Sequence, residues 1–144
     1  MNRFLLISTF TFLLSIAFGQ NKKALIIAIS DYPKASGFRS INSNNDVPIL
    51  KSALIQLGFS ENNITILKNE GATKKLILDA LQNNFLKTIN KGDIAYFHFS
   101  GHGQQVQDLS GDELDGYDEA LVPYDASANF VPGVYEGHNH IIDD

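Results

Sequence analysis

Blocks of apolar residues in the first part of the chain follow the periods of strands and helices in turn. Residues 24–29 form an almost continuous aliphatic run that is too short for a typical helix and ends at two polar residues, which predicts a buried strand. Apolar residues then recur at helical spacing and predict a helix over residues 45–57, with Pro48 in the first turn and Gly58 as terminator. The apolar stripe of this helix consists of Val47, Leu50, Leu54 and Leu57.

A second strand, a second helix and a third strand follow. Residues 64–67 predict a short strand, and Thr73 is the expected N-cap of a helix. The apolar positions of that helix are Leu76, Ile77, Ala80, Leu81 and Phe85. Residues 94–99 are apolar and aromatic and predict a third strand. This alternation of strands and helices predicts an α/β domain with a parallel sheet covered on both faces.

The regular pattern fades after Gly103. Residues 104–118 predict a polar hairpin or loop, residues 120–122 a short strand, and residues 126–140 a loop. A chain of 144 residues has room for one domain with a hydrophobic core. We expect residues 20–144 to form that domain.

Residues 1–19 have the features of a signal peptide. Arg3 gives the N-terminal region a positive charge, residues 4–18 are apolar except for Ser and Thr, and residues 17–19 form a small-x-small cleavage site. An uncleaved N-terminal anchor is the alternative, although the run is short and interrupted for a membrane span. We expect a secreted, periplasmic or extracellular domain with no membrane span after cleavage. Because the sequence contains no cysteine, disulfides do not support this domain.

The charge distribution argues against nucleic acid as a partner. The formal net charge is -5 and the lysines are scattered among acidic residues, so there is no basic stripe to neutralise phosphates. Acidic residues crowd the segment 108–125, which indicates either a cation site or a solvated loop. His138 and His140 form a His-x-His pair without a clear third ligand, and we interpret them as exposed loop residues.

Two predicted strand ends carry residues suited to chemistry: Ser30-Asp31 and the segment 100–103, Ser-Gly-His-Gly. In open parallel sheets, functional groups gather beyond the carboxyl ends of the strands. On an extended strand Ser100 and His102 would project from one face, and the glycines would let a substrate approach the backbone. An imidazole suits proton transfer near neutral pH, and a neighbouring N–H can stabilise an oxyanion. An isolated loop histidine, however, more often has no catalytic role.

Four segments in order resemble caspases and metacaspases, the cysteine peptidases of family C14. The histidine motif is matched by residues 96–103 (YFHFSGHG), the first strand by 23–32, the first helix start by 41–47 (INSNNDV), and the acidic segment after the histidine by 111–125 (GDELDGYDEALVPYD). The resemblance spans about residues 22–144. It implies proteolysis as the activity and a caspase-like three-layer α/β/α sandwich with a mostly parallel sheet.

The resemblance assigns roles to four residues. It makes His102 the catalytic histidine, a general acid toward the leaving amine, and places the Gly103 N–H in the oxyanion hole. Asp46 and Ser100 match residues that line the pocket for the substrate residue before the cut bond. A buried carboxylate there favours Arg or Lys by charge pairing. Asp46 is also explained as a first-turn helix carboxylate stabilised by the macrodipole. Ser43 stands where metacaspases usually carry a cysteine.

The resemblance also implies calcium, because many metacaspases are activated by calcium held by acidic residues in this region. The matching residues are Asp118, Asp143 and Asp144; no cofactor is expected to be strictly required. The segment is not an EF-hand, because placing Gly116 at the sixth loop position puts Val122 at the twelfth, where a carboxylate is needed. A solvated acidic loop is the alternative interpretation.

A peptidase of this type needs a cysteine thiolate, and this sequence has no cysteine. Family members carry the cysteine at the end of the next sheet strand, and by this interpretation the chain is truncated before that strand. Ser100 is not an expected substitute, because its surroundings do not match the G-x-S-x-G elbow. We therefore expect an N-terminal fragment that is inactive alone. Its strand 94–99 would be an unpaired edge that aggregates or pairs with a C-terminal fragment.

Two further interpretations stay open. One is a non-catalytic pseudopeptidase that keeps the acidic pocket and binds basic peptides. The other is a flavodoxin-like α/β domain in which Asp31 and the acidic loop bind a divalent ion, although no residue-level motif supports it.

Overall fold

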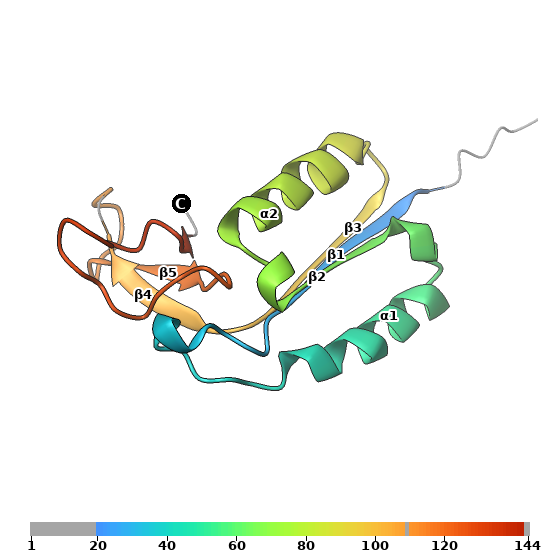
Figure 1. Ribbon diagram of the computed structural model, residues 1–144. Helices are drawn as coiled ribbons and strands as arrows, with labels where there is room; N and C mark the ends of the chain where they lie inside the picture. The colour runs from blue at the N-terminus through green and yellow to red at the C-terminus, as the bar shows by residue number, and fades with distance from the viewer. Residues whose placement is uncertain (1–19, 109, 143–144) are drawn as a thin grey trace, which may run out of the picture.

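A parallel β-sheet with a helix on each face forms the main body of the molecule, and a smaller sheet lies beyond one end of it (Figure 1). The computed structural model describes residues 20–108 and 110–142. The parallel strands are β1 (Lys22–Ala28), β2 (Ile64–Lys68) and β3 (Ile94–Ser100), in the order β2-β1-β3. The three predicted strands are thus confirmed. The predicted signal peptide lies outside the described residues and stays a prediction.

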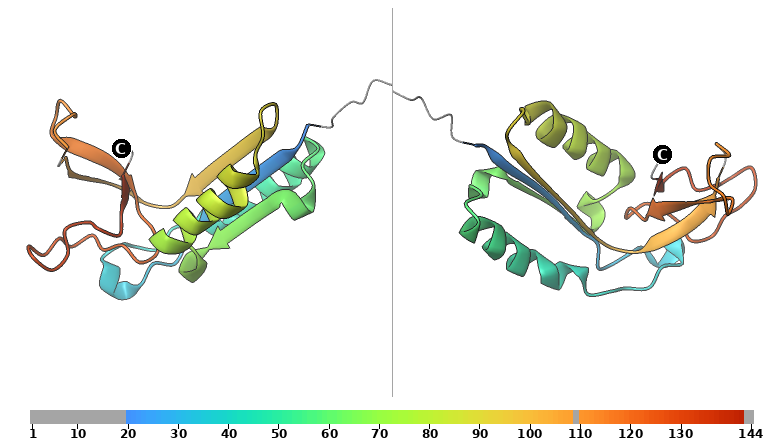
Figure 2. Two further views of the ribbon diagram at one scale, coloured as in Figure 1. Left: turned by 90° about the horizontal axis from the view of Figure 1, so that it is seen from above. Right: turned by 180° about the vertical axis from the view of Figure 1, so that it is seen from behind.

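The central strand β1 carries the core on both of its faces. Residues 24–29 are each at most 1% exposed. Ala24 and Ile26 pack with the helix on one face, whereas Leu25 and Ile27 pack with the helix on the other. Because successive side chains of a strand point to opposite faces, a strand covered on both sides must be apolar at every position. The three-layer α/β/α arrangement, visible in the right view of Figure 2, is therefore confirmed.

Helix α1 (Asp46–Gln56) covers one face of the sheet. Pro48 lies in its first turn and Gly58 follows its end with a φ of +85°, a conformation that favours glycine. Val47 and Leu54 are buried, and Leu50 packs against them. Leu57 lies beyond the last helical residue and is exposed, so its expected place on the apolar stripe is wrong.

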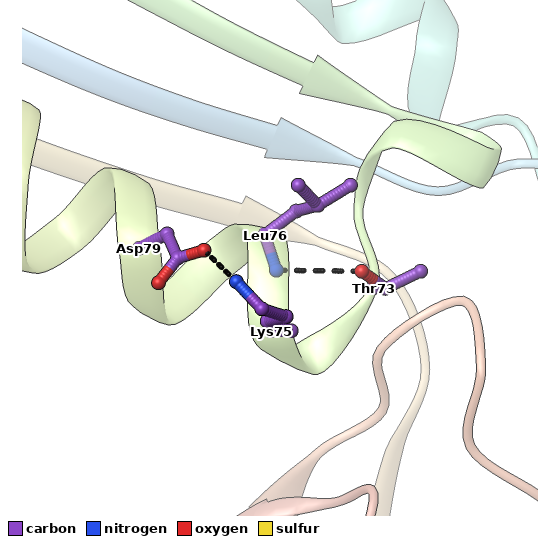
Figure 3. Close-up of polar contacts among 4 residues, drawn as sticks. All are labelled: Thr73, Lys75, Leu76 and Asp79. Atoms are coloured by element: carbon purple, nitrogen blue, oxygen red, sulfur yellow. Dashed lines mark hydrogen bonds and ion pairs between the residues drawn. The ribbon is translucent and has the colours of Figure 1, made fainter.

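The opposite face is covered by a helix whose start was predicted correctly. Helix α2 spans Lys74–Asp79 and continues as a π-helical segment, Ala80–Phe85, and a 3-10 turn, Leu86–Thr88. The Thr73 hydroxyl oxygen accepts a hydrogen bond of 3.3 Å from the Leu76 N–H, as Figure 3 shows. This bond satisfies one of the free N–H groups of the first turn. Lys75 and Asp79 form an ion pair on the outer surface.

The predicted polar hairpin is present, but it belongs to a second, antiparallel sheet. This sheet consists of β4 (Gly103–Gln107), β5 (Tyr117–Leu121) and β6 (Ile141–Ile142), in the order β4-β5-β6. Strand β5 begins at Tyr117, earlier than the predicted strand 120–122. Residues 126–140 form a loop, as predicted, with one isolated bridge between Val131 and Tyr135.

Short 3-10 turns connect the main elements. They are Lys34–Ser36, Ser43–Asn45, Glu61–Asn63 and Asn69–Gly71. Among residues 20–108 and 110–142, no helix has the length and apolar character needed to cross a membrane. Strand β3 pairs with β1 along one side only within the described residues, so it is an edge strand of the parallel sheet.

Candidate active site

Three segments converge beyond the carboxyl ends of the parallel strands: the loop that follows β1, the start of α1, and the link between β3 and β4. Strand β3 ends at Ser100 and β4 begins at Gly103, so His102 lies at the junction of the two sheets. The expected continuous strand from Ser100 through His102 is therefore absent. Ser100 and His102 have different partners, described in turn below.

The imidazole of His102 packs against two aromatic rings from the loop after β1. Its ring centroid lies 5.2 Å from that of Phe38, nearly parallel to it, and 5.1 Å from that of Tyr32. Phe38 follows Gly37, which has a φ of +81°. The His102 side chain keeps part of its surface exposed. An imidazole that is held in place yet reachable from solvent is suited to proton transfer.

A backbone carbonyl fixes the protonation pattern of this ring. His102 Nε2 lies 2.8 Å from the carbonyl oxygen of Arg39. A carbonyl oxygen only accepts hydrogen bonds, so Nε2 carries the proton in the neutral ring and Nδ1 is the basic nitrogen. This contact could not be predicted from the sequence, because a backbone carbonyl has no residue-type signature.

The backbone N–H of Gly103 points away from the second sheet. Val122 N donates to the His102 carbonyl oxygen at 3.0 Å, and Gly103 is opposite Leu121 in the antiparallel register. This pattern makes Gly103 and Leu121 a non-hydrogen-bonded pair, in which neither N–H is directed at the partner strand. The Gly103 N–H is thus directed to the open side of β4, beside His102. That position suits an oxyanion donor.

The two glycines of the motif serve different purposes. A Cβ at Gly101 would lie 2.8 Å from the Tyr32 hydroxyl oxygen and 2.9 Å from the Phe99 ring. Gly101 is therefore needed for packing inside the protein, rather than for the approach of a substrate as the sequence suggested. A Cβ at Gly103 would meet only the Ala120 carbonyl oxygen, at an ordinary 3.6 Å.

Asp46 and Ser100, which the resemblance assigns to the substrate pocket, contact each other. Asp46 is the first residue of α1, and its Oδ2 accepts a hydrogen bond of 3.0 Å from the Ser100 hydroxyl. Asp46 is exposed, so the carboxylate is not the buried one that was expected. Its position in the first helical turn agrees with the macrodipole interpretation. In this structure an attraction between Asp46 and a cation is therefore partly screened by water.

A polar cluster that sequence reasoning missed ties β1 and β2 to the start of α1. Asn69 Oδ1 accepts hydrogen bonds from Ser30 N at 2.9 Å, Asp31 N at 3.3 Å and Asn44 Nδ2 at 3.3 Å. Its φ of 42° is the only positive value at a non-glycine among the described residues. Asn tolerates this region better than most residues. Ser43 is buried beside this cluster.

Acidic side chains gather at the open end of the second sheet. Asp118 is 2% exposed, and one oxygen each of Asp108, Asp112 and Asp118 lies within 4.8 Å of the others. Backbone N–H groups of Gly111 and Glu113 donate to the Asp108 carboxylate and lower its pKa. Asp108 and Asp112 are partners of Asp118 that sequence reasoning did not single out. Asp143 and Asp144 lie outside the described residues.

The expectation for the His-x-His pair is half wrong. His138 is exposed, but His140 is only 1% exposed. The His140 Nε2 hydrogen-bonds Gln104 Oε1 at 3.0 Å, and its Nδ1 hydrogen-bonds the Tyr135 hydroxyl at 3.1 Å. Burial lowers the His140 pKa from its ordinary value, with a further contribution from the nearby Lys74 charge. His140 is a structural link between the 126–140 loop and β4.

Comparison with known proteins agrees with this arrangement. The family model "Metacaspase, peptidase C14 domain" matches residues 22–144. Metacaspase-1 of Eremothecium gossypii is 34% identical over 131 residues, which is 86% of this chain and 26% of that protein. Metacaspase-1A of Aspergillus niger is 33% identical over 130 residues, which is 85% of this chain and 29% of that protein. This chain thus spans about a quarter of the length of these curated relatives.

A solved structure supports the fold. The crystal structure of protein GSU0716 from Geobacter sulfurreducens superimposes with a TM-score of 0.63 and 29% identity, covering 86% of this chain and 42% of that one. The flavodoxin-like interpretation is therefore wrong, because the same residues match a family model along the whole predicted domain. The chain belongs to the metacaspase family of peptidase C14 domains.

Proposed function

We propose that residues 22–144 form the histidine-bearing part of an endopeptidase that cuts after Arg or Lys, with His102 as its acid–base group. The hydrogen bond between His102 Nε2 and the Arg39 carbonyl supports this role most directly, because it leaves Nδ1 as the atom that exchanges protons. Membership of a C14 peptidase family supports a protein substrate.

The residues of this chain supply two of the three groups that the reaction needs. His102 Nδ1 takes the proton of the cysteine thiol, the thiolate attacks the peptide carbonyl, and the Gly103 N–H stabilises the resulting oxyanion. His102 then gives that proton to the leaving amine, and water hydrolyses the acyl-enzyme that remains. The sequence has no cysteine to supply the thiolate. The 144-residue chain alone is therefore inactive, and it works only with a cysteine carried by other residues.

A chimera tests the proposed activity. Residues 22–144 replace the matched segment of Eremothecium gossypii metacaspase-1, and hydrolysis of fluorogenic peptides with Arg, Lys or Asp before the scissile bond is measured. We expect cleavage after Arg and Lys that is abolished by His102→Ala. The isolated chain serves as the inactive control. Cleavage by the isolated chain, or an active His102→Ala chimera, would contradict the proposal.

Asp46 is the proposed partner of the basic substrate residue. Its carboxylate is already hydrogen-bonded to Ser100, which orients it before substrate arrives. In the chimera we expect Asp46→Asn to raise KM for the Arg peptide about two- to fivefold, because the charge of an exposed carboxylate is lost while the shape is kept. Asp79→Asn, which changes an exposed carboxylate of α2, is the matched control.

A non-catalytic role is the second candidate, and the lack of cysteine favours it. In that case the isolated chain binds a peptide amide ending in Arg through Asp46 without cutting it. Isothermal titration calorimetry with the purified chain distinguishes the two. Binding that Asp46→Asn abolishes, combined with an inactive chimera, favours the binding module over the peptidase.

We also propose that the acidic cluster binds calcium. Carboxylate oxygens are the ligands that calcium prefers, and those of Asp108, Asp112 and Asp118 lie close enough to share one ion. Thermal unfolding of the isolated chain is measured with increasing CaCl2, with Asp112→Asn as the test and Asp115→Asn as the control. A melting temperature that does not rise with calcium would indicate a solvated acidic loop instead.

The edge strand β3 and the N-terminal segment carry two remaining proposals. The free edge of β3 accepts a strand from another chain segment, such as a C-terminal fragment, which would complete the parallel sheet.

Residues 1–19 direct the protein out of the cytoplasm as a cleaved signal peptide. Mass spectrometry of the exported protein tests the cleavage of this signal peptide, and we expect Gln20 as the first residue of the mature protein.

A further inference from the structure

The hydroxyl of Tyr32 lies at the point where the two sheets meet. Tyr32 comes shortly after β1 and is buried in the core cluster that α2 covers. Its hydroxyl donates to the Val122 carbonyl oxygen at 3.0 Å and accepts from the His102 backbone N–H, also at 3.0 Å. Burial raises the Tyr32 pKa, so the hydroxyl keeps its proton at neutral pH and remains a donor.

These bonds close a ring of three hydrogen bonds around the backbone of His102. Val122 N donates to the His102 carbonyl oxygen at 3.0 Å, which completes the circuit from Tyr32 to Val122 to His102. Both backbone polar groups of His102 are therefore satisfied by groups that lie far away in the sequence. The His102 carbonyl is held by a bond that continues the β4–β5 ladder, whereas the His102 N–H has no strand partner and is held by the Tyr32 hydroxyl.

The same tyrosine also limits the position of the His102 side chain. Its ring centroid lies 5.1 Å from that of His102 and 5.5 Å from that of Phe38, so the three rings are in mutual contact. The Arg39 carbonyl lies next to Phe38 and accepts from His102 Nε2. A shift of the His102 backbone would therefore lengthen the bond that sets its tautomer.

The tight fit at Gly101 is independent support for a fixed hydroxyl position. The Tyr32 hydroxyl oxygen lies 2.8 Å from the place where a Cβ on Gly101 would be, closer than real Cβ contacts come. Any residue other than glycine at position 101 would push the hydroxyl away from the His102 N–H. Glycine at position 101 is thus required by the Tyr32 hydroxyl together with the Phe99 ring.

We propose that Tyr32 is a positioning residue for His102: its hydroxyl holds the His102 backbone against Val122 and thereby keeps the imidazole in the tautomer whose Nδ1 is basic. The hydroxyl also occupies the His102 N–H, which leaves the Gly103 N–H as the donor available to an oxyanion. The contribution of Tyr32 to catalysis rests on the peptidase function proposed above, whereas the effect of Tyr32 on the His102 tautomer does not.

The test uses the isolated chain and nuclear magnetic resonance. Long-range 1H–15N spectra report which ring nitrogen of His102 carries the proton, and amide exchange reports the His102 N–H. We expect the wild type to show the Nε2–H form. Tyr32→Phe should mix the two tautomers and speed exchange of the His102 amide about fivefold or more, because its acceptor is lost.

Two further variants make the result specific. Tyr124 packs on the same core cluster, so Tyr124→Phe removes a hydroxyl there without touching His102, and it should leave the His102 spectra unchanged. Gly101→Ala should reproduce the effect of Tyr32→Phe by displacing the hydroxyl. His102 signals and amide exchange that stay as in wild type in Tyr32→Phe would overturn the proposal, even if Gly101→Ala changes them, because an alanine at position 101 also displaces the Phe99 ring.

The chimera separates this role from the peptidase function. There, Tyr32→Phe should lower kcat for the Arg peptide at least tenfold with KM unchanged, because the substrate pocket at Asp46 is not altered. Equal losses in Tyr32→Phe and Tyr124→Phe would indicate a merely structural role. A chimera that is inactive with Tyr32 in place contradicts the peptidase function, and the NMR comparison then decides the role of Tyr32.

Discussion

His102 Nε2 lies 2.8 Å from the carbonyl oxygen of Arg39, a residue 63 positions earlier in the chain. The contact joins the β3–β4 junction to the loop after β1, and it depends on the path of that loop. Gly37 and Phe38 set this path directly before Arg39. The chemistry of the histidine is therefore controlled by the backbone of a loop that contributes no acidic or basic side chain to the contact.

Gly37→Ala should disturb His102 from a distance. Gly37 has a φ of +81°, and a Cβ there would lie 3.2 Å from both Ala128 Cβ and Asn129 Nδ2. We expect a loss of about 1–2 kcal/mol in the free energy of unfolding from the left-handed backbone alone, measured by urea denaturation. The loop should also move, which would change the ring 15N shifts of His102.

Gly92→Ala is the matched control for this variant. Gly92 has a φ of +100°, but a Cβ there would meet nothing within 4 Å. It should cost a similar backbone strain and leave the His102 shifts unchanged. Identical His102 spectra in Gly37→Ala and wild type would show that the loop does not hold the Arg39 carbonyl in place.

Thr73→Ala should remove the N-cap of α2. Among the described residues, Thr73 is the only N-cap residue whose own side chain accepts a hydrogen bond from its helix, and the Asp125 carboxylate separately accepts from Lys74 N. Loss of the Thr73 hydroxyl leaves the Leu76 N–H without that acceptor and should lower the free energy of unfolding by about 1 kcal/mol. Lys75→Ala, which breaks the exposed pair with Asp79, should cost less than about 0.5 kcal/mol in the same denaturation experiment. Equal costs for the two variants would refute the importance of the cap.

The parts of the fold that follow a period were predictable from the sequence. The buried run of β1, the Thr73 cap and the Gly58 terminator each have a local physical cause, and the structure confirms all three. The second sheet could not be recognised in this way. Its third strand, Ile141–Ile142, is too short to show any period, and its pairing with β5 is decided by contacts distant in sequence.

In the candidate site, too, residues that belong to a sequence motif were predictable and contacts made only in the folded chain were not. Asp46 and Ser100 were identified through their motifs, and they do meet. The Arg39 carbonyl and the acceptor role of Asn69 were missed, because the first is a backbone atom and the second depends on a single left-handed residue. His140 was interpreted as an exposed loop residue because the His-x-His pair lacks a clear third ligand, whereas its burial depends on Gln104, which becomes its neighbour only in the folded chain.

His140 should make stability depend on pH near neutrality. Burial lowers its pKa in the folded chain below the unfolded value of about 6.5. The unfolded state then binds more protons below that pH, so stability is fully present above about 6.5 and is lost as pH falls toward the folded pKa. Urea denaturation at pH 7.5 and at pH 5.5 measures the loss. The carboxylates whose pKa is lowered, such as Asp93 and Asp108, contribute only at more acidic pH.

Separate substitutions of His138 and His140 show which of the two histidines causes this pH dependence of stability. His140→Gln should reduce the difference in unfolding free energy between the two pH values, because Gln does not titrate. His138→Gln changes an exposed residue two positions away and should leave the difference as in wild type. A pH dependence that survives in His140→Gln would place the responsible group elsewhere.

Phe97→Lys should keep the isolated chain monomeric. Phe97 lies on strand β3, whose outer edge pairs with none of the described strands, and is 43% exposed, so an apolar ring and backbone groups are available together for pairing with a second chain. We expect the wild-type domain to associate as its concentration rises, measured by size exclusion with light scattering, and Phe97→Lys to suppress this association by placing a charge on the edge. Ile49→Lys is the matched control, because Ile49 is 69% exposed on α1 and lies away from the strand edge. If Ile49→Lys suppresses association and Phe97→Lys does not, the surface that associates lies on the helix. A wild-type domain that stays monomeric at every concentration would show that β3 is not a pairing edge.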